Sequence, residues 1–265
     1  MGSMESDDIA ASQEHSDTTV PQPGGILMAR WQTLRIPAGG IVLRVGSGGL
    51  QLEPVVPELA LEMWPHWFEI ALRHASVARQ HHAQLLNARD CQSPTTGQHL
   101  DDELQSSIQT ITAMAFAVDA FYGSLLEQIN VAPSTKAAWA HNKTPRHARV
   151  LEAIRLGSVL RNDQVRSLKR GLSSLFKFRD WAVHPPADFR HPLLHPDLQV
   201  GVDQRFLAFS SPNADRAVLC GLEVLVRALD HPRDIAAFRP WSASMRQILD
   251  DLLRAAHMTY ADSAP

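Results

Sequence analysis

The stretch at residues 104–129 constrains the fold more than any other, because its apolar residues recur at spacings of four and three over about seven helical turns. Residues at these spacings lie on one face of an α-helix. Such a face most often packs against helices of the same chain, and it can also pair with the same helix of a second copy. A long amphipathic helix is therefore expected, with this apolar face: Leu104, Ile108, Ile111, Ala115, Val118, Tyr122, Leu125 and Ile129.

A helical period recurs in most of the chain after residue 56, so the predicted fold class is mainly α, an up-and-down helical bundle over residues 57–260. A helix is expected at residues 57–90, kinked or restarted at Pro65, and a polar loop at residues 91–99. The predicted starts of the other helices are Asp101 or Asp102, Thr144-Pro145, Asn162 or Asp163, Asn213, and Pro240.

Two short β segments are expected beside the helices. At residues 26–56 the apolar period shifts towards two, and the glycine-rich run 46–49 separates two alternating stretches, which predicts a small hairpin or meander. The run lacks the Lys-Ser/Thr of a phosphate loop. Residues 198–202 and 205–209 predict a second hairpin. Residues 1–25 are rich in polar residues and are expected to be a disordered tail.

Composition limits where and how the chain could act. Lys and Arg number 25 against 28 Asp and Glu, so the net charge near −3 gives no global attraction to nucleic acid, and any RNA must bind locally. The two cysteines, Cys91 and Cys220, are predicted to be buried thiols in a reducing compartment. A cytoplasmic protein that neither enters a membrane nor is secreted is expected.

The stretch FKFRDWAVHPP, residues 176–186, holds the candidate site. Arg179 occupies a position on the apolar face of its helix where the period favours an apolar residue. Pro185 disfavours the α region for His184, so the helix should end near Val183 and leave the imidazole free to turn back. Asp180 lies four residues before His184, close enough to accept from one ring nitrogen.

The arginine, the polar residue after it and the histidine five positions on resemble the Arg-x4-6-His signature of the HEPN superfamily. The upstream helix ITAMAFAVDAFYGSLLEQ and a pair of short strands after the motif are also similar, so that the resemblance covers residues 57–230. It implies a compact helical bundle that cleaves RNA as a homodimer, with two motifs facing each other. Toxin and phage-defence proteins of this kind can have an antitoxin or a neighbouring-gene protein as partner.

Within that resemblance, His184 would act as base or acid, Arg179 would clamp the phosphate and Asp180 would orient His184. No metal and no cofactor are expected. One alternative is a non-catalytic helical module that binds a partner protein or a nucleotide through the groove at the motif. Another is that the strands at residues 26–53 form the recognition surface and the bundle only carries them.

Two groups of histidines are candidate metal sites, and their positions in the sequence argue against both. His81 and His82 are adjacent, and adjacent helical residues point about 100° apart, so they are expected to be polar surface or a single buried histidine. His184, His191 and His195 lie in a stretch whose prolines rule out the helix that would align the last two.

Overall fold

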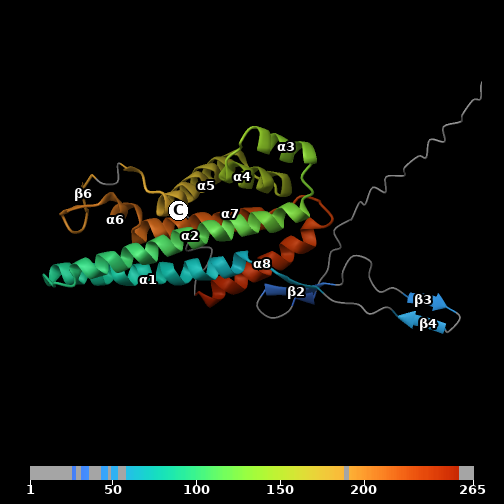
Figure 1. Cartoon of the computed structure of the whole chain (residues 1–265), viewed down its shortest axis with the longest axis horizontal. Helices are drawn as coiled ribbons and strands as arrows, with labels where there is room; N and C mark the ends of the chain where they lie inside the picture. Colours follow the sequence, from blue (N-terminus) through green and yellow to red (C-terminus); the bar gives the residue numbers. More distant parts are fainter. Residues whose placement is uncertain are drawn as a thin grey trace, which may run out of the picture.

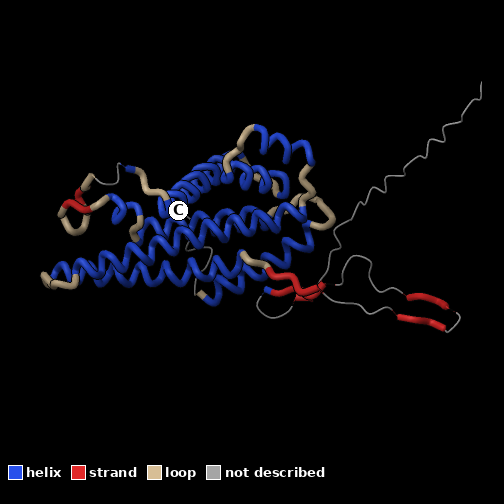
Figure 2. Tube along the Cα trace, in the orientation of Figure 1, coloured by secondary structure: helices blue, strands red, loops and turns tan. Residues whose placement is uncertain are grey.

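The structure is a computed structural model that describes residues 26–27, 31–35, 43–46, 49–52, 58–187 and 191–256. The predicted tail at residues 1–25 lies outside the described residues. The fold is mainly helical, as expected from the sequence, with short strands near its start and before α6 (Figure 1 and Figure 2). In the described residues, no helix is both long enough and apolar enough to cross a membrane.

A long antiparallel helical hairpin forms the base of the molecule. It consists of α1 (Trp64–Asp90) and α2 (Thr96–Gln128), which lie side by side along most of their length (Figure 1). At 1.5 Å per residue, α2 is about 50 Å long. The small residues Ala71, Ala75 and Ala78 of α1 are all buried, and they allow the two helices to approach closely. The apolar face predicted for α2 is buried inside the chain from Ile111 to Leu125.

Both helices of this hairpin begin at other residues than predicted. Residues 58–61 form a strand, so α1 begins at Trp64 with Pro65 in its first turn, seven residues later than predicted. Proline fits there because the N–H that it lacks would have no helical partner. Helix α2 begins at Thr96, and the predicted caps Asp101 and Asp102 lie inside it.

The other helices cover the hairpin. Helix α7 (Ser211–Asp230) packs on α2 and α1, and α8 (Phe238–Ala255) packs on α7 and α1. The approach of α7 to α2 depends on Gly221, because a Cβ there would lie 2.0 Å from Met114 Sδ. The largest side chains of this core that are fully buried include Trp64, Phe68, Phe121 and Phe238. Burying each of these stabilises the fold by about 1.5–3 kcal/mol.

Three helices follow the helical hairpin in the chain: α3 (Pro133–His141), α4 (Arg146–Gly157) and α5 (Asn162–Val183). Helix α5 ends at Val183 as predicted. The observed residues before α5, α7 and α8 are Arg161, Ser210 and Ala237. The predicted cap Asn213 therefore lies three residues after the observed cap Ser210, and the predicted start Pro240 lies two residues after the first residue of α8, Phe238.

The strands are short. β1 (Ile26–Leu27), β2 (Gln32–Arg35) and β5 (Glu58–Leu61) form an antiparallel sheet. The glycine-separated hairpin is confirmed, as β3 (Leu43–Gly46) pairs with β4 (Gly49–Leu52).

A hairpin follows α5 as predicted, but its strands are formed by other residues than predicted. β6 (Leu193–Leu194) pairs with β7 (Gly201–Val202), whereas the predicted second strand is mostly the short helix α6 (Gln204–Ala208). The carboxylate of Asp203 accepts the Arg205 N–H, which caps this helix and explains the difference.

Candidate functional site

Arg179 is held at the C-terminal end of α5 by its immediate neighbours. Its Nε and Nη2 groups donate to Asp180 Oδ1 at 3.1 and 2.7 Å. Its Cζ lies 4.8 Å from the centre of the Phe176 ring, and Phe176 is buried. The side chain remains 26% exposed, and Asp180 is exposed beside it. The guanidinium is thus oriented at the surface, and no buried acid among the described residues immobilises it.

His184 is the first residue after α5. Its φ of −128° and ψ of 73° are not helical, as expected for a residue before proline, and its backbone N–H donates to the Asp180 carbonyl at 2.8 Å. The side chain is exposed and makes no hydrogen bond with the described residues. Since the Asp180 carboxylate receives Arg179 instead, the orienting role of Asp180 stays a prediction.

His195 has a different environment and does not join His184. Its Nδ1 accepts the backbone N–H groups of Asp197 and Leu198 at 3.2 and 3.3 Å, and its side chain is only 5% exposed. Burial lowers the pKa of His195, an effect that the carboxylates of Asp197 and Glu103 oppose. His195 therefore holds the β6–β7 turn as a neutral imidazole.

A cavity of about 560 Å³ opens between α5 and α7, beside the motif. Arg170 and Phe178 of α5 and Arg216 of α7 line it together with Cys220. Burial raises the pKa of the Cys220 thiol to about 12, so this thiol stays protonated and unreactive. The prediction of two buried thiols is wrong for Cys91, which is exposed at the end of α1.

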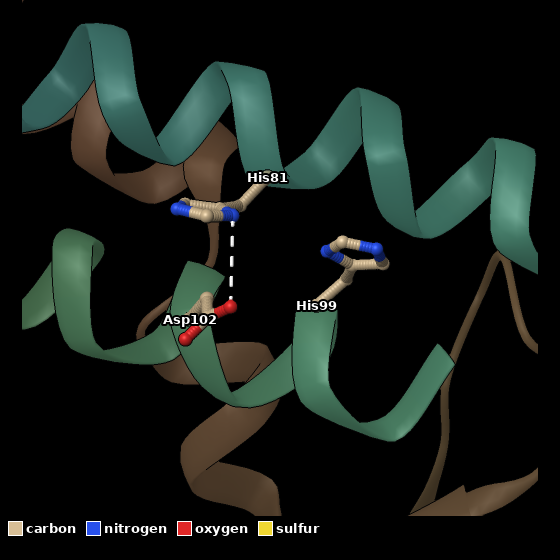
Figure 3. Close-up of side chains that lie close together, drawn as sticks. All are labelled: His81, His99 and Asp102. Carbon is tan, nitrogen blue, oxygen red and sulfur yellow. Dashed lines mark ion pairs between the residues drawn. The ribbon is translucent and has the colours of Figure 1, made fainter. Parts of the chain in front are cut away.

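The structure separates the adjacent histidines of α1. His82 Nδ1 lies 3.2 Å from Glu103 Oε2, whereas His81 faces His99 and Asp102 of α2 (Figure 3). No pattern in the sequence groups these last three residues. Placing the start of α2 at Asp101 or Asp102 left His99 in a loop, which concealed its three-residue helical spacing to Asp102.

Comparisons of the chain with protein-family models, with curated proteins and with solved structures found no match.

Proposed function

We propose that this protein is a metal-independent endoribonuclease that resembles the HEPN superfamily and works as a homodimer with two copies of the motif in one site. The observation that carries the proposal is that the end of α5 holds both an oriented, partly exposed guanidinium and an exposed imidazole. Such a pair can meet the charge of a phosphodiester and move a proton beside it.

The surface around the motif supports the dimer. Val183 at the end of α5 is 66% exposed, and Leu194 in β6 is 62% exposed. Leu193 and Val200, which belong to the same hairpin region, are also exposed apolar residues. An exposed apolar side chain directly beside the charged motif, as Val183 is, fits a surface that a second copy covers.

The chemistry needs a base, a cation and an acid. His184 of one copy takes the proton of the ribose 2′-hydroxyl, and the 2′-oxygen attacks the adjacent phosphorus. Arg179 donates to the phosphate oxygens while their charge develops. The 5′-oxygen leaves with a proton from the imidazolium of the second copy's His184. The products are a 2′,3′-cyclic phosphate and a 5′-hydroxyl. RNA is favoured over DNA because the nucleophile is the 2′-hydroxyl.

The test is RNA cleavage by purified variants. Arg179→Ala and His184→Ala are each expected to lower the rate by at least about 100-fold, because each removes a group that acts in the transition state. Arg161→Gln, at the exposed start of the same helix, and His141→Gln, an exposed histidine of α3, are matched controls that should keep the wild-type rate. Wild-type cleavage in either motif variant would refute the proposal.

A second candidate function is binding of an anionic ligand, such as a nucleotide, without turnover. The cavity between α5 and α7 favours it, because two arginines, Arg170 and Arg216, line it together with the aromatic residue Phe178. Nucleotide binding that Arg216→Ala abolishes, in a protein that leaves RNA intact, would favour this function over cleavage.

A toxin or phage-defence role, with an antitoxin as partner, belongs to the first proposal. It is tested by expressing the protein in cells with and without the His184→Ala change.

A further inference from the structure

We propose that His81, His99 and Asp102 form a binding site for a divalent transition-metal ion, with Zn²⁺ the best fit. Each residue offers one ligand atom, and these three atoms lie within 4.8 Å of one another (Figure 3). Two imidazoles and a carboxylate are a ligand set that Zn²⁺ accepts. This proposal is independent of the nuclease proposal, because none of the three residues belongs to the α5 motif.

The helical hairpin brings the three ligands together. His99 and Asp102 are three residues apart on α2, so they project from the same face of that helix. His81 projects from the facing side of α1, and its ring lies beside the Asp102 carboxylate and the His99 ring (Figure 3). The convergence thus depends on α2 beginning before His99.

Two ring nitrogen atoms of this cluster are buried without a hydrogen bond. They are His81 Nδ1 and His99 Nδ1, and neither has a hydrogen-bond partner among the described residues. His81 Nδ1 lies 3.8 Å from Asp102 Oδ2, an ion-pair distance (dashed line in Figure 3) that is too long for a hydrogen bond. Buried nitrogen atoms without partners destabilise a fold, and a metal ion would satisfy them.

The distances require only a small contraction. In a tetrahedral site with Zn–N distances of about 2.0–2.1 Å, neighbouring ligand atoms lie about 3.3 Å apart. Rotations of three partly exposed side chains can bring the present atoms to that separation. Metal binding would tie the end of α1 to the first turns of α2, across the turn that joins them.

A buried neighbour fixes the backbone on which the ligands lie. Glu103 is 2% exposed, and its Oε1 accepts the Ser211 N–H of α7 at 2.7 Å. Its Oε2 lies 3.2 Å from His82 Nδ1. Because His82 follows His81 and Glu103 follows Asp102, this contact sets the register of α1 against α2 at the site.

The three ligands leave one coordination position open. His99 also lines a surface cavity of about 290 Å³, together with Asn87, Cys91 and Thr95. A water molecule or a small anion can reach the ion from this side, as at zinc sites with three protein ligands.

The test measures metal binding by the full-length protein after removal of metal with EDTA. The zinc content after gel filtration is expected to be one ion per chain. At a free Zn²⁺ concentration about 100 times Kd, the Tm should rise by about 5–10 °C. His81→Ala, His99→Ala and Asp102→Ala should each weaken binding by more than about 100-fold. His141→Ala and Asp101→Asn are matched controls, being exposed residues of the same types outside the cluster, and should bind as the wild type does.

A spectroscopic measurement on the wild-type protein tests the site even if the alanine variants fold poorly. Co²⁺ added to the wild-type protein should give the visible absorption bands of a four-coordinate site, and Cys91→Ser should leave these bands unchanged because no thiolate is a ligand. The proposal is overturned if the wild-type protein takes up no Zn²⁺ or Co²⁺, or if stoichiometric binding persists in the triple alanine variant or depends on Cys91.

Discussion

His184 and His195 belong to one short segment after α5, yet their surroundings are opposite. His195 is buried and accepts two backbone N–H groups at Nδ1, so the fold favours its neutral imidazole. The His184 side chain is exposed and makes no hydrogen bond with any residue that the structure describes. The first arrangement uses a histidine to build a turn, whereas the second leaves an imidazole available to take up and release a proton.

The same contrast separates the carboxylates near the two histidines. Glu103 of α2, close to His195, is buried and joins its helix to two others: to α1 through His82 and to α7 through Ser211. Asp180, four residues before His184, is exposed, and its carboxylate binds only the neighbouring Arg179 among the described residues. The region of Glu103 and His195 should therefore carry stability, and the end of α5 should carry activity.

The largest expected effect on stability is that of Glu103→Ala. It leaves the Ser211 N–H without its partner and opens a cavity between three helices, which should lower the free energy of unfolding by about 2–4 kcal/mol. Urea unfolding measures the change. Glu127→Ala, an exposed position on the same helix, is the matched control and should have almost no effect. Equal effects of the two variants would contradict the structural role of Glu103.

Gly221→Ala is next in size. The added Cβ would lie 2.0 Å from Met114 Sδ, so α7 must move away from α2 or Met114 must change its position, at a cost of about 1–3 kcal/mol. Gly123→Ala on α2 has open space around the new methyl group and should instead stabilise by about 0.4–1 kcal/mol. Unfolding curves that rank these two variants in the opposite order would show that the α2–α7 packing is wrong.

The pH dependence of stability sharpens the comparison further. Burial lowers the pKa of His195 in the folded state below the ordinary imidazole value of about 6.5. As the pH falls below about 6.5, the unfolded chain therefore binds a proton that the folded chain does not, and stability decreases. In His195→Asn, the side-chain oxygen can still accept the two N–H groups but does not titrate. Between about pH 7.5 and about pH 5.5, this variant should lose less stability than the wild type.

The smallest expected effect on stability is at the motif itself. Arg179→Ala and His184→Ala remove side chains that contact few other residues, so each should change the free energy of unfolding by less than about 1 kcal/mol. Thermal unfolding beside the cleavage measurement distinguishes lost chemistry from lost fold. A destabilisation as large as that of Glu103→Ala would mean that the motif is a structural anchor.

Much of the helical fold could be predicted, because an apolar period is a local property of the sequence. The apolar face of α2 was predicted from this period, and the end of α5 at Val183 was predicted from another local signal, Pro185. Helix α3 has no buried residue, so it lacks the period that would have revealed it. The strand at residues 58–61 pairs with β2, and that pairing depends on a segment more than twenty residues away.

The candidate sites differ in the same way. Arg179, Asp180 and His184 are neighbours in the sequence, so a local pattern was enough to group them. Asp180 binding to Arg179 instead of His184 could not be predicted, because several partners lie within reach of one exposed carboxylate. His81 meets His99 and Asp102 only through the packing of two helices, and a helix start misplaced by five or six residues hid that contact.

The most direct test of the central claim is the chemistry of the RNA ends that the protein produces in the presence of EDTA. An RNA of defined sequence is incubated with the wild-type protein and with His184→Ala, and the 3′ ends of the fragments are identified by mass spectrometry. The proposal predicts 2′,3′-cyclic phosphate ends with the wild type, no fragments with His184→Ala, and no cleavage at a nucleotide that lacks its 2′-hydroxyl. Intact RNA with the wild type, or the same fragments with His184→Ala, would contradict it.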